Sequence, residues 1–298
     1  MRVFYHDLFT FPLPEKHRFP IAKYRLVRER LLAEGILAPE ELRLPPAASD
    51  AQLETAHTPA YVRKVRLGAL TPAEIRRIGF PWSPQLVERS RRSVGSSIAA
   101  GRAALTDGLA VNLAGGTHHA HPDCGSGYCV FNDVAVAIRV LQREGRIRRA
   151  AVVDCDVHQG DGTAAIFAGD PSVFTFSVHG ANNFPFRKSR SSLDIPLPDG
   201  AGDALYLRAV EEGLRAALDG RPPDLVFYLA GADPFEGDSL GRLAVSKAGL
   251  AGRDRLVLRT CREAGVPVAV VMGGGYARRM SDIVDIHVQT VKVCKEMT

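Results

Sequence analysis

The middle of the chain reads Val152-Val153-Asp154-Cys155-Asp156-Val157-His158-Gln159-Gly160-Asp161-Gly162, which places three carboxylates and one histidine directly after an apolar run. Charged groups seldom follow a core strand unless a cation pairs with them. Side chains alternate along an extended segment, so we predict that Asp154, Asp156 and His158 project to one side. Oxygen and nitrogen donors on one face are what zinc and similar divalent metals accept. A loop of solvated acids is the competing interpretation.

Composition favours one large α/β domain over residues 1–298, because the chain has 46% hydrophobic content and no linker, low-complexity tract or repeat. No apolar run approaches the roughly 18–20 residues that a membrane span needs, and residues 1–7 lack the long apolar core of a signal peptide. The five cysteines contain no C-x-x-C pair and indicate neither a disulfide framework nor a cysteine zinc site. We therefore expect a cytoplasmic protein without membrane contact.

The charge of the chain is mildly basic, with a formal net charge of +5. Most arginines, such as those at positions 89–92, are scattered over expected helices and are interpreted as solvated helix faces. Direct nucleic-acid binding is not expected, because aromatic residues make up only 7% of the chain and no basic stripe contains them. The densest loop cluster, Arg187-Lys188-Ser189-Arg190, leaves open an acidic partner.

Apolar runs and amphipathic stretches alternate along most of the chain. Strands are predicted at residues 109–113, 150–153, 173–178, 225–230 and 266–272, and helices at residues 22–33, 85–105, 132–143, 205–218 and 247–264. This rhythm is typical of a mostly parallel central sheet with helices on both faces. The proline-rich first 80 residues are expected to wrap the sheet. Residues 68–84 are interpreted as a mobile rim loop or an ordinary surface connection.

Unusual residues follow four of these strands. Open α/β sheets bind ligands outside the carboxyl ends of their strands, so the four segments are expected to meet at one edge. The segments are Gly115-Gly116-Thr117-His118-His119, the acid cluster, Gly231-Ala232-Asp233-Pro234, and Gly273-Gly274-Gly275-Tyr276.

Chemical roles follow from what a catalytic zinc ion requires, which is three protein ligands and one open position. Asp156 and His158 supply two ligands, and Asp233 is the natural third. Neighbouring histidines 118 and 119 suit proton transfer better, since histidine titrates near neutral pH. They would need carboxylate acceptors, which Asp154 and Asp161 could provide. The histidine pair acting as metal ligands or helix caps stays an alternative.

Tyr276 follows three glycines, which let the backbone turn tightly and direct a phenol inward. A phenol donates well to an oxyanion. Together these residues suit metal-assisted attack of water on a carbonyl, with histidine as proton acceptor and donor. No G-x-S-x-G motif supports an acyl-enzyme route.

These motifs resemble the zinc-dependent histone deacetylases and their bacterial relatives, most of all class IV and short bacterial amidohydrolases. The resemblance extends from about residue 4 to residue 290. It rests on the four segments above, on Gly127-Tyr128-Cys129-Val130-Phe131-Asn132-Asp133 and on Gly237-Asp238-Ser239-Leu240-Gly241. N-terminal signatures are His17-Arg18-Phe19-Pro20 with Lys23-Tyr24, and His57 with Tyr61-Val62.

The resemblance implies an arginase/deacetylase-like fold and a role for each matched position. One Zn²⁺ would be held by Asp156, His158 and Asp233. His118 and His119 would be the active-site histidines, with Asp154 and Asp161 as their orienting acids, and Tyr276 the oxyanion tyrosine. Substrate would contact Gly127, Tyr128, Phe184, Gly274 and Gly275. Tyr128 stands where the family usually has phenylalanine. A structural K⁺ site would lie near Asp154, Ser177 and Val178.

The substrate implied is an acyl-lysine peptide or protein, or another acylated small amine. Three alternatives remain. A two-manganese arginase-like enzyme would need further acids where Gly160 and Gly231 stand. An acetylpolyamine amidohydrolase would use the same catalytic set. A non-catalytic acyl-ligand sensor would usually have lost one of the catalytic residues.

Overall fold

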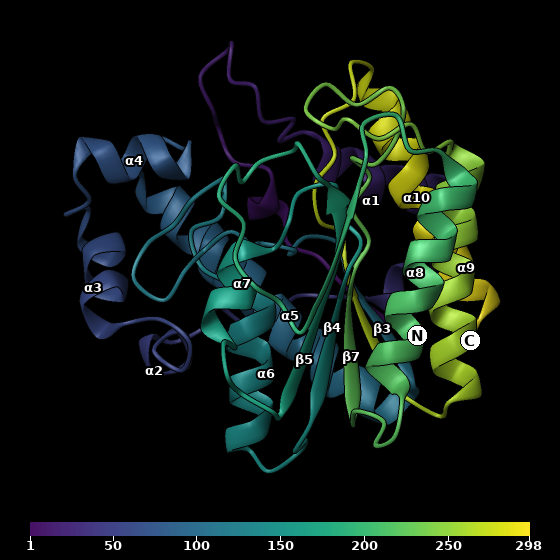
Figure 1. The fold of residues 1–298 in the computed structure, drawn as a ribbon. Coiled ribbons are helices and arrows are strands. Elements are labelled where there is room, and N and C mark those ends of the chain that lie inside the picture. The colour runs from purple at the N-terminus through teal and green to yellow at the C-terminus, as the bar shows by residue number, and fades with distance from the viewer.

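A computed structural model describes residues 1–298 and shows one eight-stranded sheet with helices on both faces (Figure 1). The strand order is β2-β1-β3-β8-β7-β4-β5-β6, and every neighbouring pair is parallel. The strands are β1 (Arg2–Phe4), β2 (Leu42–Arg43), β3 (Leu109–Asn112), β4 (Ala150–Asp154), β5 (Val173–Gly180), β6 (Leu193–Leu197), β7 (Leu225–Leu229) and β8 (Val268–Val271). The predicted α/β fold is confirmed.

Two groups of helices cover the sheet (Figure 1). One face carries α5 (Pro84–Asp107) and α6 (Asp133–Arg143), and the other carries α8 (Asp203–Leu218), α9 (Lys247–Glu263), α10 (Met280–Glu296) and α1 (Lys23–Ala33). The shorter helices are η1 (Asp7–Phe9), η2 (Pro39–Glu41), α2 (Asp50–Leu53), α3 (Pro59–Leu67), α4 (Pro72–Ile78) and α7 (Asp161–Ile166). None of the helices combines the length and the apolar character needed to cross a membrane.

The central strands explain why the site lies where it does. Every residue of β4, β7 and β8 is buried, as expected for strands covered on both faces. Because all strands run in parallel, their carboxyl ends share one edge of the sheet. Asp154 pairs with Leu229, and Leu229 pairs with Val271, so the motifs that follow these three residues emerge side by side.

The N-terminal region differs from the prediction. Two short strands within the first 80 residues, β1 and β2, extend the sheet instead of wrapping it. Two- and three-residue strands are too short to show an alternating pattern. The expected loop at residues 68–84 contains helix α4, which begins with a capping box between Thr71 and Glu74 and ends at Gly79 in a left-handed conformation. The cap residues mark both ends of this helix in the sequence.

Beyond the N-terminal region, three further elements were not predicted. Edge strand β6 is only partly buried and contains a proline, so it lacks a strand-like pattern. Helix α7 begins within the acid cluster itself, and α10 closes the chain against α9 and α1.

Candidate active site

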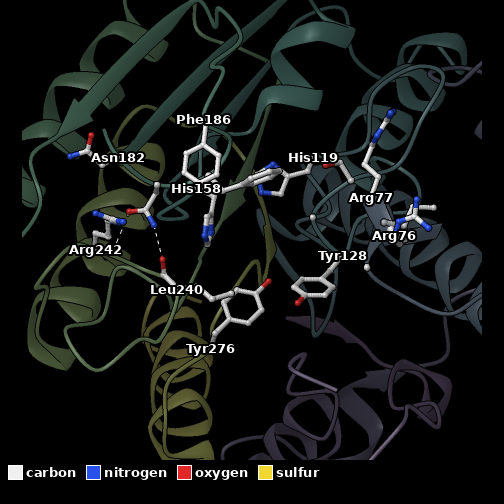
Figure 2. Close-up of a pocket in the computed structure, with 16 residues that line it drawn as sticks. Arg76, Arg77, His119, Tyr128, His158, Asn182, Phe186, Leu240, Arg242 and Tyr276 are labelled. Atoms are coloured by element: carbon white, nitrogen blue, oxygen red, sulfur yellow. Dashed lines mark hydrogen bonds between the residues drawn. The ribbon is translucent and has the colours of Figure 1, made fainter. Parts of the chain in front are cut away.

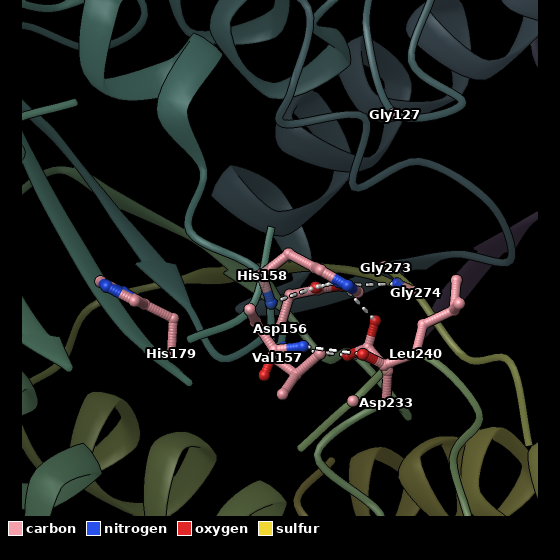
Figure 3. A network of polar contacts seen from close by, with 12 residues as sticks. Gly127, Asp156, Val157, His158, His179, Asp233, Leu240, Gly273 and Gly274 are labelled. Atoms are coloured by element: carbon pink, nitrogen blue, oxygen red, sulfur yellow. Dashed lines mark hydrogen bonds and ion pairs between the residues drawn. The ribbon is translucent and has the colours of Figure 1, made fainter. Parts of the chain in front are cut away.

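The three predicted metal ligands converge at the carboxyl ends of β4 and β7 (Figure 3). The ligand atoms of Asp156, His158 and Asp233 lie within 4.8 Å of one another, and all three residues are buried. Nδ1 of His158 lies 3.0 Å from Oδ1 of Asp156 and 3.3 Å from Oδ2 of Asp233. Strand alternation explains this arrangement only in part, because β4 ends at Asp154 and the chain bends over the next residues.

One oxygen of this cluster is left without a hydrogen bond, although Nδ1 of His158 lies 3.3 Å from it. Oδ1 of Asp233 accepts the Val157 N–H at 2.9 Å, but its Oδ2 is buried without any hydrogen bond. Buried polar atoms are nearly always satisfied, so an orphaned carboxylate oxygen calls for a cation. Burial, and then the negative charge of Asp156, raises the pKa of Asp233 above its ordinary value. Two carboxylates and one imidazole with an unsatisfied oxygen fit a catalytic zinc ion.

Glycines make room for the cluster. A Cβ atom on Gly274 would lie 1.9 Å from Oδ2 of Asp233, and one on Gly231 would lie 2.8 Å from Cα of Asp156. A Cβ on Gly160 would lie 2.5 Å from Oδ2 of Asp154. The two positions where a dinuclear arginase-like site needs acids therefore have no room for a side chain, and a single ion fits.

His118 and His119 each face a separate carboxylate. Nδ1 of His118 lies 2.7 Å from Oδ2 of Asp154, and Nδ1 of His119 lies 2.6 Å from Oδ1 of Asp161. The ring centroids of the two histidines are only 4.1 Å apart.

The two imidazoles have opposite pKa shifts. Burial lowers the pKa of His118, but the charges of Asp154 and Asp156 outweigh it and raise that pKa to about 9. Burial, and then the charge on His118, lowers the pKa of His119 to about 4. The pair therefore combines one imidazole of raised pKa with one of lowered pKa.

Asp238, which belongs to the Gly237–Gly241 motif but had no predicted role, positions Tyr276. The Tyr276 backbone N–H donates to Oδ2 of Asp238 at 2.6 Å, and Asp238 also accepts the N–H groups of Leu240 and Gly241. The Tyr276 ring lies 6.2 Å from the His158 ring, between centroids. Burial, and then the charges of Asp233 and Asp156, raises the pKa of Tyr276 well above its ordinary value, so the phenol keeps its proton.

A cavity of about 510 Å³ leads to these residues (Figure 2). His119, His158 and Tyr276 lie at its inner end, and Gly127, Tyr128 and Phe184 are part of its wall.

The backbone of this wall is held in an unusual conformation. Gly127 and Tyr128 have φ values of 52° and 65°, and a Cβ on Gly127 would lie 2.6 Å from the His119 ring. Gly274 lines a smaller cavity of about 30 Å³, which Asp156, His158 and Tyr276 also line, whereas Gly275 lines neither cavity.

Two buried cations near the site were missed. Arg89 was expected on a solvated helix face, but it is only 2% exposed and donates to the Tyr24 hydroxyl at 3.0 Å. Nζ of Lys23 donates to the Gly273 carbonyl at 3.3 Å and lies 5.6 Å from the Tyr276 ring centroid. Neither cation has a carboxylate partner. Lys23 lies within a quoted signature, but nothing in the sequence separates Arg89 from the arginines that follow it.

Comparisons with known proteins agree on the family. A family model described as "Histone deacetylase domain" matches residues 17–291. An uncharacterised protein of Picosynechococcus sp. is 50% identical over 96% of this chain and 95% of its own. The "Histone deacetylase-like amidohydrolase" of Pseudomonas aeruginosa is 31% identical over 87% of this chain and 72% of its own. Among solved structures, the HDA15 HD domain matches with a TM-score of 0.84 at 23% identity, over 99% of this chain and 88% of that chain.

Proposed function

The chain belongs to the histone deacetylase family, and from that premise we propose that it is a zinc-dependent hydrolase of acyl amides of lysine or a similar amine. The observation that carries the proposal is the unsatisfied Oδ2 of Asp233 beside Asp156 and His158, at the inner end of a cavity. A zinc ion bound there would polarise the substrate carbonyl and lower the pKa of a water molecule towards roughly 7.

The surrounding residues would move the protons. His119 is neutral at neutral pH and faces the cavity, so it accepts a proton from water as the oxygen attacks the carbonyl carbon. Asp161 holds the His119 ring through Nδ1 and leaves Nε2 for the reaction. As the C–N bond breaks, the proton passes from His119 to the leaving amine.

His118 and Tyr276 would stabilise charge. Protonated His118, held by Asp154, contributes a positive charge beside the reacting centre. The Tyr276 phenol keeps its proton and donates a hydrogen bond to the developing oxyanion. Gly127, Tyr128 and Phe184 would enclose the methylene stem of the substrate, which suits an aromatic-lined slot.

A potassium ion near Asp154, Ser177 and Val178 remains part of the proposal. Asp154 and Ser177 are register partners on β4 and β5, and Oγ of Ser177 lies 3.0 Å from Nδ1 of His179. The pairing brings both residues together but gives no ligand geometry for an ion.

A turnover panel on zinc-loaded protein tests the function. It compares acetyl-, octanoyl- and myristoyl-lysine peptides with acetylated polyamines, and a hydroxamate chelator serves as control. Hydroxamate-sensitive cleavage of a lysine amide supports the proposal, and preference for a polyamine supports the acetylpolyamine alternative. Zinc-loaded protein that binds these compounds without cleaving any would instead be an acyl-ligand sensor.

A further inference from the structure

The mouth of the active-site cavity is cationic. Three arginines and no aspartate or glutamate are among the residues that line the cavity. Arg76 and Arg77 stand on one side of the opening, and Arg242 stands on the other (Figure 2). This arrangement disfavours basic substrates, because like charges repel at close range.

The backbone of Arg77 is anchored to the cavity wall. Its carbonyl accepts the Gly127 N–H at 3.1 Å, and the next carbonyl, of Ile78, accepts the Tyr128 N–H at 2.7 Å. A Cβ on Gly79 would lie 2.9 Å from the Tyr128 ring, so α4 packs closely against this wall. The two arginines in the last turn of α4 are therefore held at the entrance to the tunnel.

Neither Arg76 nor Arg77 has a carboxylate partner in an ion pair. Both side chains are exposed. The one acid of α4, Glu74, is already bound to Lys64 at 2.9 Å and caps its own helix. Asp123 forms no ion pair with Arg77, but both residues act on the pKa values of His121 and Cys124, so Asp123 offsets part of the Arg77 charge.

Arg242, on the opposite side, differs from this pair. Its guanidinium lies 3.1 Å from Oδ2 of Asp199, and the Asn182 side chain donates to the same carboxylate. Among the arginines that line the cavity, those without an ion-pair partner therefore both lie on α4.

A second basic segment flanks the opening. Phe186, which is 87% exposed, lines the cavity and is followed by exposed Arg187 and Arg190, which form no ion pair. The segment is fixed by Gln159, which donates to the Ser189 carbonyl at 2.7 Å and accepts the Ser189 N–H at 2.9 Å. The basic loop 187–190 is therefore hydrogen-bonded to Gln159, the residue that follows His158.

We propose that the preferred substrate is an acyl-lysine within an acidic stretch of polypeptide, whose carboxylates contact Arg76 and Arg77, which form no ion pair, and the loop 187–190. This inference rests on the proposed hydrolase function and adds the class of substrate. An acetylated polyamine, which carries ammonium groups, is a poor substrate for the same reason.

Exposed charge pairs contribute modestly to the free energy of binding. We therefore expect the preference for acidic peptides to appear in KM and in the association rate constant more than in kcat. We expect kcat/KM for an acidic peptide to exceed that for a basic peptide by about tenfold at low salt. The ratio shrinks as salt rises, because the screening length falls to about 3 Å at 1 M.

The experiment uses three peptides that share one central acyl-lysine and differ only in flanking residues: aspartate and glutamate, serine and glutamine, or lysine and arginine. Zinc-loaded wild-type protein is compared with Arg76→Gln/Arg77→Gln. A matched control, Arg208→Gln/Arg215→Gln, removes the same net charge from exposed positions on α8. Both kcat and KM are measured for every peptide at low and high salt.

The inference is supported when the acidic peptide has the lowest KM, and when only Arg76→Gln/Arg77→Gln reduces that advantage. Equal KM values for the three peptides, or a lower KM for the basic peptide, would overturn it. Turnover of the neutral peptide reports on the hydrolase function by itself. A flat charge response with good neutral turnover therefore refutes the substrate class alone, whereas no turnover of any peptide refutes the function beneath it.

Discussion

Nε2 of His121 lies 2.9 Å from Oδ2 of Asp161. The other oxygen of this carboxylate holds Nδ1 of His119 at 2.6 Å, so one acid serves two imidazoles. His121 is on the solvent side, with its side chain 27% exposed, and its pKa is raised chiefly by the hydrogen bond to Asp161. His121 therefore competes with His119 for the same carboxylate.

Replacing His121 by leucine is expected to make His119 a stronger base. The pKa of His119, about 4 in the intact protein, should rise by up to about one unit once Asp161 serves it alone. A proton acceptor works only in its neutral form, so activity is lost as the pH falls through this pKa. The acid limb of kcat/KM against pH should move to higher pH, with the plateau little changed. An unmoved acid limb would show that the two imidazoles are not coupled.

The stabilisation of the fold by bound zinc should increase with pH. Burial lowers the pKa of His158, but the nearby carboxylates of Asp156 and Asp233 outweigh it and raise that pKa in metal-free protein to about 10. The protonated form therefore stabilises the metal-free fold below about pH 6.5, and this contribution is lost as the pH rises towards 10. Zinc needs the unprotonated nitrogen.

The corresponding measurement is the difference in Tm between zinc-loaded and metal-free protein. We expect it to increase from about pH 6.5 to about pH 8.5. Asp156→Ala should bind no zinc and show no such difference at any pH. A zinc-dependent Tm gain that stays constant over this range would contradict the assignment of His158.

Two tyrosines whose ring centroids are 6.0 Å apart provide a matched pair of variants. Tyr276→Phe should retain zinc and Tm but lose about 10²- to 10³-fold in kcat, the usual cost of removing an oxyanion donor. Tyr128→Phe should change kcat by no more than a few-fold, because its ring contributes to the wall. Near-normal turnover of Tyr276→Phe on every active amide would remove Tyr276 from the mechanism.

Two glycines should respond in opposite ways to alanine. Gly274→Ala places a Cβ 1.9 Å from Oδ2 of Asp233, so it should lower Tm and abolish stoichiometric zinc binding. Gly252→Ala, on helix α9, meets nothing closer than Leu207 at 3.6 Å and should stabilise the protein by up to about 1 kcal/mol. Metal analysis and thermal unfolding separate the two outcomes, and a zinc-binding Gly274→Ala protein would show that the cluster can shift.

Elements with a hydrophobic pattern that repeats over several residues are the ones best predicted from the sequence. Central strands and long helices carry clear patterns, so the sheet and the edge where Asp154, Gly231 and Gly273 emerge could be located. Strands β1 and β2 are too short for any pattern and depend on tertiary pairing. Their place in the sheet is therefore visible only in three dimensions.

The same distinction applies to the site. Asp156, His158 and Asp233 could be predicted as candidate metal ligands because few residue types bind zinc and these follow the strands. The buried state of Arg89, the shared carboxylate of Asp161 and the anchoring of α4 all depend on contacts between distant segments. His121 and Asp161, for example, are separated by 40 positions and meet only through the fold.

The order of strands also constrains how the protein is made. The last strand in the chain, β8, inserts between β3 and β7 in the middle of the sheet. While a ribosome is still synthesising the chain, β3 and β7 each have one unpaired edge, and the two halves of the sheet have no strand to join them. Gly274, which binds Asp156, and Tyr276 both follow β8. The site residues therefore come together only once β8 has paired with both neighbours, and a nascent chain that stops before residue 268 leaves the edges of β3 and β7 unpaired.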